Sequence, residues 1–178
     1  MRVAVVADST CDLPAALCER YGIRIIPVTI NFGTESYPDD GQSLPRSVFY
    51  ARFVRYDPLP TTAAFSVGQA EAVFREALAE ADHVIAVHIP RSISSLIESA
   101  QQAAAQIGNR QVTVFDTGSL SMGAGWLALI AGELAAAGKA PADILGALED
   151  ARARLRVWAG LDTLEHLRRS GRDRSPAV

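Results

Sequence analysis

Short hydroxyl and carboxylate side chains follow three predicted strands at the points where those strands end. The clusters are Asp8-Ser9-Thr10, residues 92–95 with Ser94 and Ser95, and residues 116–119 beginning at Asp116. The carboxyl ends of parallel strands meet at one edge of a sheet, and helices that begin there present open backbone N–H groups to an anion. We therefore predict a site for a carboxylate or phosphate at this edge. The alternative is that each serine or threonine only caps its own helix.

Two catalytic interpretations fit the residue spacing less well. Residues 119–123 resemble a nucleophile elbow, which makes a serine hydrolase using Ser121 or Ser119 an alternative function. The first position of this motif is serine rather than glycine, and no histidine is clearly placed to act as the base. A carboxylate phosphatase would have two aspartates two residues apart, whereas Asp12 comes four residues after Asp8. We therefore expect a protein that is not an enzyme.

Composition and spacing also argue against several kinds of ligand. The net charge of −3 gives no overall attraction for nucleic acid. The glycines do not have dinucleotide-binding or Walker spacing, so we expect no cofactor. The three histidines and two cysteines lack metal-ligand spacing, so we expect no metal. Met1-Arg2 leads directly into a short strand, and no apolar run is long enough to span a membrane, which predicts a cytoplasmic protein.

Short apolar runs alternate with segments of helical periodicity. We expect strands at residues 3–7, 23–30, 83–89 and 111–115, and helices at about 12–22, 47–56, 68–81, 94–107, 121–137 and 141–156. Pro27 favours an edge position for its strand, and the Gly-, Pro- and Asp-rich residues 33–47 are typical of a loop. The order predicts a three-layer α/β/α fold with a mainly parallel sheet.

The end of the chain differs from what precedes it. We expect residues 1–156 to form the α/β/α domain. Residues 157–178 are expected to begin a second domain, with a strand starting at Val157, a short helix at 163–169 and an arginine-rich tail. An arginine-rich segment of this kind either belongs to an interaction surface or is a solvated helix face with a frayed end.

Several segments, taken in order, resemble the DegV family of bacterial fatty-acid-binding proteins. Residues 3–14 (VAVVADSTCDLP) are similar to its opening strand and Asp-Ser-Thr turn, and residues 26–41 to its second strand and Tyr-x-Asp-Gly loop. Residues 60–66, 88–100 and 115–125 match further motifs in sequence order. Residues 163–172 (TLEHLRRSGR) resemble its Thr-Leu-Glu-Tyr-Leu-x-x-Gly-Gly-Arg segment. The resemblance covers nearly the whole chain.

The resemblance implies an α/β/α first domain and a second α/β domain that hold a long-chain fatty acid between them. It implies that Thr62 and Ser94 hydrogen-bond the carboxylate of the ligand. It also implies that a fatty acid kinase phosphorylates the presented acid, with Arg172 near the surface that faces the kinase. Phe65 stands where the family usually has proline, and we expect its ring to narrow the pocket.

The resemblance stops before the usual C-terminal region of the family. The resemblance implies further residues that would complete the second sheet and the tunnel wall, and the given sequence ends at Val178 before them. We therefore expect exposed apolar surface around Trp158 and Leu161, and a homodimer or a disordered tail beyond about Gly160. The alternative function is an interaction or remnant domain that binds no lipid.

Overall fold

The computed structural model describes residues 1–53, 55–108 and 111–170. The chain forms two compact units, each built from two stretches of sequence. Unit 1 comprises residues 1–28 and 64–156, and unit 2 comprises residues 29–63 and 157–178. One boundary between the units falls after residue 156, and the predicted division into domains at this position stays a prediction. The structure additionally groups residues 29–63 with the C-terminal segment.

A four-stranded parallel sheet lies at the centre of unit 1. Its order is β2-β1-β6-β7, with bounds Ile23–Ile26, Val3–Asp8, His83–His88 and Val112–Asp116. Every residue of β6 is buried, as its continuous apolar pattern predicts for a strand covered on both faces. The order also places β2 at an edge, as expected, although Pro27 lies just beyond the last residue of the strand.

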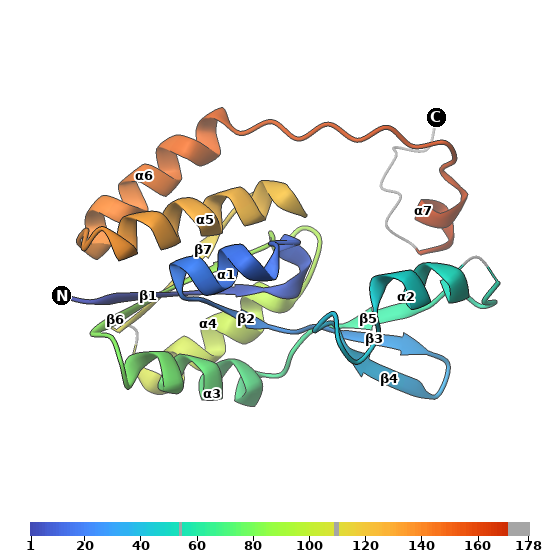
Figure 1. Ribbon diagram of the computed structural model, residues 1–178, viewed down its shortest axis with the longest axis horizontal. Helices are drawn as coiled ribbons and strands as arrows, with labels where there is room; N and C mark the ends of the chain where they lie inside the picture. Colours follow the sequence, from blue (N-terminus) through green and yellow to red (C-terminus); the bar gives the residue numbers. More distant parts are fainter. Residues whose placement is uncertain (54, 109–110, 171–178) are drawn as a thin grey trace. The chain divides into compact units, whose positions relative to one another are not determined.

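Helices cover both faces of this sheet, which confirms the predicted three-layer architecture (Figure 1). On one face lie α1 (Ala15–Tyr21), α5 (Met122–Ala136) and α6 (Pro141–Arg154). On the other lie α3 (Val67–Leu78) and α4 (Leu96–Ile107). Ser66 begins α3 with a capping box: its hydroxyl accepts from the Gln69 N–H, and the Gln69 side chain accepts from the Ser66 N–H.

Two glycines allow α5 to lie close to neighbouring backbone. A side chain at Gly125 would collide with the backbone carbonyl of Cys11, and one at Gly132 would press on the side chain of Ile23. Because α5 is buried over most of its length, this close approach fixes the short 3-10 helix η1 (Ser9–Cys11) against the first turns of α5. The segment that follows β1 therefore depends on Gly125 for its position, while Gly132 allows α5 to pack against Ile23 of β2.

Unit 2 contains a small antiparallel sheet that the sequence did not predict. Its order is β4-β3-β5, with bounds Glu35–Pro38, Thr29–Phe32 and Thr61–Ala63. The predicted strand 23–30 is therefore wrong as a single element, because the chain leaves the parallel sheet after Ile26 and enters β3 two residues beyond Pro27. The predicted loop 33–47 is also partly wrong, since β4 forms a hairpin with β3 through Gly33, whose φ is 62°.

Two helices complete unit 2, namely α2 (Arg46–Phe53) and α7 (Glu165–Arg169). Aromatic rings pack between β3 and the α2 region: Phe32 lies edge-on to Phe49 at 5.8 Å and to Tyr56 at 5.0 Å between ring centroids. The predicted strand at Val157 does not form. Residues 157–164 have no regular structure, and α7 is the next element of the chain. Within the described residues, no helix is long and apolar enough to cross a membrane.

Candidate functional site

The carboxyl edge of the unit 1 sheet brings together side chains from three neighbouring strands. Asp8 ends β1, His88 ends β6 and Asp116 ends β7, with His88 and Asp116 paired in register. Parallel pairing of β1 with β6 explains why Asp8 meets His88, although the two residues are 80 positions apart. The predicted gathering of polar groups at this edge is therefore present.

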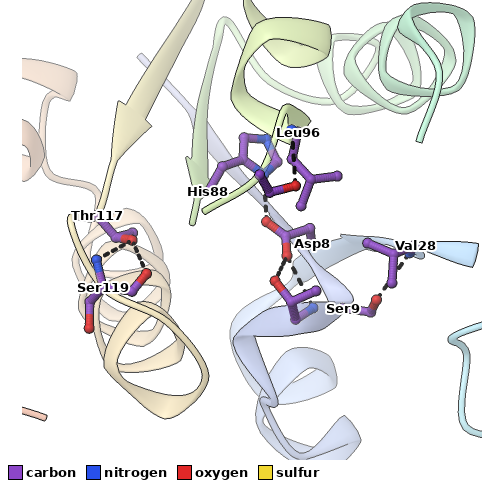
Figure 2. Close-up of polar contacts among 9 residues, drawn as sticks. Asp8, Ser9, Val28, His88, Leu96, Thr117 and Ser119 are labelled. Carbon is purple, nitrogen blue, oxygen red and sulfur yellow. Dashed lines mark hydrogen bonds and ion pairs between the residues drawn. The ribbon is translucent and has the colours of Figure 1, made fainter. Parts of the chain in front are cut away.

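Asp8 and His88 form a buried pair (Figure 2). The Nδ1 atom of His88 lies 2.9 Å from Oδ2 of Asp8, and both residues are fully buried. Burial by itself would raise the pKa of Asp8, but hydrogen bonds from His88 and Thr10 and the charge of His88 hold that pKa below its ordinary value. Asp8 is therefore a carboxylate that accepts hydrogen bonds, and Nδ1 of His88 is the donor.

The other hydroxyls beside Asp8 organise the backbone after β1. Thr10 donates both its backbone N–H and its hydroxyl to Oδ1 of Asp8. The Oγ of Ser9 accepts a hydrogen bond from the Val28 N–H at 3.1 Å. The side chain of Asp8 thus caps η1, whereas the alternative gave the capping role to the serines and threonines. Ser9 instead connects η1 to Val28, two residues beyond the end of β2.

The serines after β6 lie in a tight turn. The N–H groups of Ile93 and Ser94 both donate to the carbonyl of Pro90, which turns the chain directly after the strand. The Oγ of Ser94 accepts from the Leu96 N–H at 3.4 Å, the long end of the hydrogen-bond range. Ser95 occupies the N-cap position of α4 without capping it through its side chain. Neither serine is used as a conventional helix cap.

Asp116 and the residues after it line a cavity of about 610 Å³ in unit 1. The Oδ1 of Asp116 accepts from the Gly118 N–H at 2.9 Å, while its backbone carbonyl accepts from the guanidinium of Arg152 at 2.8 Å. Arg152 also stacks on the ring of Phe115, 5.1 Å from its centroid, and pairs with Glu149. Polar groups therefore line the cavity, and the guanidinium of Arg152 already pairs with the carboxylate of Glu149.

Thr62 lies in unit 2, on strand β5, where its side chain is exposed. It lines a second cavity, of about 480 Å³, together with Thr61 and with Arg169 of α7. The guanidinium of Arg169 pairs with Asp57 at 2.5 Å. Arg172, the predicted kinase-facing residue, lies outside the described residues.

Phe65 is buried in the core of unit 1. Its ring centroid is 5.5 Å from that of His88, so the aromatic ring helps to enclose the imidazole. The structure thus gives Phe65 a packing role beside the Asp8–His88 pair. Its expected effect on a ligand pocket stays a prediction.

Ser121, the alternative nucleophile, has an aspartate as its partner. Its hydroxyl donates to Oδ2 of Asp12 at 2.7 Å. Ser121 has φ 51° and ψ −140°, an unusual conformation for a residue other than glycine. This geometry resembles a strained nucleophile turn, but the hydrogen-bond partner is a carboxylate where a serine hydrolase has an imidazole.

Sequence reasoning missed His88, which it treated as a structural residue of its strand. The available signal was its place at the end of a strand whose inner residues are all apolar, shortly before the serine-rich turn. Within residues 1–53, 55–108 and 111–170, no cluster of three or more His, Cys, Asp or Glu side chains could hold a metal ion.

Comparison with known proteins decides the family. A model of the DegV family, described as uncharacterised proteins, matches residues 2–173. The chain belongs to the DegV family. Protein DegV of Bacillus subtilis is 34% identical over 173 residues, which are 97% of this chain and 61% of that protein. The chain therefore spans about three fifths of the length of this DegV relative.

Solved DegV structures share the fold. A Thermus thermophilus DegV protein, described as binding fatty acid, superposes with a TM-score of 0.86 at 35% identity, covering 97% of this chain and 61% of that one. DegV of Bacillus subtilis, described as a fatty acid binding protein, superposes with a TM-score of 0.84 at 31% identity, with the same two coverages. The α/β architecture is thus that of DegV proteins.

Proposed function

We propose that this chain binds a long-chain fatty acid by its carboxylate. The observation that carries the proposal is the likeness, over 97% of the chain, to a Thermus thermophilus protein described as binding fatty acid. The polar carboxyl edge of unit 1 and the threonine-lined cavity of unit 2 support it, since each offers hydrogen-bond donors that suit an anionic head group.

The proposed carboxylate ligands are Ser94 in unit 1 and Thr62 in unit 2, as the family resemblance implies. A hydroxyl bond contributes little net free energy, whereas each buried methylene contributes about 0.8 kcal/mol. Ten buried methylenes would give roughly 8 kcal/mol before the entropy cost of association. The hydroxyls therefore orient the acid, and the acyl chain supplies most of the affinity.

Lipid extraction and native mass spectrometry of the purified 178-residue chain test this function. We expect a bound fatty acid, or uptake of added palmitate. Thr62→Ala and Ser94→Ala should each weaken palmitate binding. Thr34→Ala is the matched control for Thr62, because Thr34 is an exposed threonine of unit 2 in the turn between β3 and β4 and does not line this cavity. Ser92→Ala is the control for Ser94, because Ser92 is an exposed residue of the same turn. A chain that takes up no palmitate contradicts the proposal.

We further propose that the bound acid is presented to a fatty acid kinase, with Arg172 at the contact surface. The family resemblance and the arginine-rich C-terminal segment support this step. Arg172→Glu should abolish phosphorylation of bound palmitate by a bacterial fatty acid kinase and leave palmitate binding unchanged. Equal phosphorylation with wild-type and variant chains would rule out this role for Arg172.

We propose binding rather than catalysis, because the hydroxyl of Ser121 pairs with a carboxylate and not with an imidazole. A serine-directed fluorophosphonate should therefore leave the chain unlabelled. Labelling that Ser121→Ala abolishes and Ser119→Ala retains would instead establish the serine hydrolase.

A second candidate function is an interaction domain that binds no lipid. The exposed apolar side chains of the C-terminal segment favour it: Trp158 is 91% exposed and Leu161 61% exposed. A lipid-free chain that associates with itself or with another protein through this segment would support the interaction domain over the fatty acid carrier. The expected homodimer belongs to this proposal.

A further inference from the structure

The turn between β6 and α4 carries Ser94, the proposed carboxylate ligand of unit 1. The N–H groups of Ile93 and Ser94 donate to the carbonyl of Pro90, which closes the turn on itself. Its local connection to α4 is weak: the Leu96 N–H lies 3.4 Å from Oγ of Ser94, and the Ser95 side chain makes no cap. Backbone and capping contacts therefore define the position of the turn on α4 only loosely.

Arg91 adds two bonds from the turn to α4. Its Nε lies 3.0 Å from Oε1 of Glu98, and its Nη2 donates to Oε1 of Gln101 at 2.8 Å. Glu98 and Gln101 are three residues apart on α4, so they lie on the same side of the helix. The planar guanidinium of an arginine can bond two such acceptors at once. One side chain thus fixes the turn to α4 at two points.

The carboxylate of Glu98 depends on this bridge. The Glu98 side chain is 35% exposed, and its Oε2 is buried without a hydrogen-bond partner among the described residues. A fully exposed ion pair contributes little to stability, but a carboxylate that is partly withdrawn from water is costly to leave without its cation. The bond to Arg91 is therefore stronger than that of an ion pair in open solvent.

We propose that Arg91 is a positioning residue for the ligand-binding hydroxyl of Ser94. Within residues 91–95, Ser94 is half-buried and the other four residues are exposed, so the bridge holds the one side chain of the turn that faces the protein. Groups that bind a ligand need supporting contacts of this kind to keep them in the productive geometry. This inference rests on the proposed function and adds a residue that acts without touching the fatty acid.

Palmitate affinity, measured by isothermal titration of the full chain, tests this role. Arg91→Met keeps an unbranched side chain and removes the bridge. We expect it to raise the Kd about fivefold, less than Ser94→Ala does, because the hydroxyl is displaced rather than deleted. Exchanging the two charges, by Arg91→Glu together with Glu98→Arg, should restore the bridge and return the Kd to within about twofold of the wild type.

Arg75→Met is the matched control. Arg75 on α3 pairs with Glu71 at 2.7 Å, and its side chain is 59% exposed, against 62% for Arg91. Loss of a surface ion pair should by itself affect both variants alike, whereas the proposed role weakens palmitate binding in Arg91→Met alone. Wild-type affinity in Arg91→Met, or an equal rise of the Kd in Arg75→Met, would overturn the inference.

Amide hydrogen exchange tests the bridge without any ligand. Arg91→Met should speed exchange at the N–H groups of Ile93 and Ser94, because the turn opens more often, and Arg75→Met should leave both rates unchanged. Equal exchange rates in the wild type and Arg91→Met would show that the bridge does not hold the turn, whether or not the chain binds palmitate.

A double-mutant cycle tests whether Arg91 acts through Ser94. In the Ser94→Ala background, Arg91→Met should cause no further loss of affinity, because the hydroxyl that it positions is already absent. Additive losses would mean that Arg91 acts by another route. A wild-type chain that binds no palmitate contradicts the proposed function and the inference with it, whereas wild-type binding with additive losses contradicts the inference alone.

Discussion

Ser121 donates a hydrogen bond to Asp12 over 2.7 Å, and both residues have positive φ angles, 51° for Ser121 and 55° for Asp12. They are the positive-φ residues other than glycine in the described part of the chain. The hydrogen bond therefore joins two strained backbone positions, one after η1 and one before α5. Such a bond compensates for part of the strain at both ends.

This relationship predicts how substitutions at Ser121 rank in stability. Ser121→Ala keeps the side-chain clash of a positive φ and loses the bond to Asp12, whereas Ser121→Gly relieves the strain. We expect Ser121→Gly to be more stable than Ser121→Ala by about 1–2 kcal/mol in urea unfolding. The same pair at Ser119, which does not have positive φ, should show no advantage for glycine. Equal stability of both Ser121 variants would refute strain at this position.

The contact of Gly125 with the Cys11 carbonyl gives a second prediction. Gly125→Ala places a methyl group into backbone that cannot move aside, and should destabilise unit 1 by about 1–3 kcal/mol. Gly146→Ala in α6 is the control, because nothing lies within 4 Å of the added methyl group and the site is exposed. It should stabilise the helix by about 0.5–1 kcal/mol. Urea midpoints that move in the same direction for both variants would contradict the close approach of α5.

The Asp8–His88 pair makes stability depend on pH in the acid range. The pKa of Asp8 is lowered in the folded chain, so its contribution is present above the unfolded pKa of about 4 and is lost as the pH falls through the folded value. Asp8→Asn should therefore cost about 1–3 kcal/mol near neutral pH, because it leaves the buried Nδ1–H of His88 without its carboxylate acceptor. The difference between wild type and variant should shrink below about pH 4 in unfolding experiments. A difference that stays constant on acidification would be inconsistent with an ionised Asp8.

The exposed apolar segment after α6 predicts self-association. Replacing Trp158 and Leu161 together by serine removes two of its largest exposed side chains and should shift the chain to monomer in sedimentation velocity. Trp126→Ser is the control, because Trp126 is 53% exposed but lies on α5 in unit 1. If wild type and double variant sediment alike, the segment does not mediate association.

Local sequence pattern determined most of unit 1. The buried strands β1 and β6 and the helices α3, α4, α5 and α6 were predictable, because apolar runs and helical periodicity are properties of neighbouring residues. Their alternation also determined the parallel sheet, and parallel strands necessarily bring their polar ends to one edge. Family motifs spread along the chain determined the DegV assignment for the same reason, since each motif is a local string.

Tertiary structure alone decided which of those polar groups meet. Strand order pairs Asp8 with His88, and the packing of α5 pairs Asp12 with Ser121, across 80 and 109 positions of sequence. It also decided that residues 29–63 leave the parallel sheet. The strands β3, β4 and β5 are short, β4 and β5 are largely exposed, and the three are held by hydrogen bonds to one another rather than by a continuous apolar pattern. Residue types reveal which groups can do chemistry, whereas contact between distant groups depends on the order of strands and the approach of helices, which no local pattern contains.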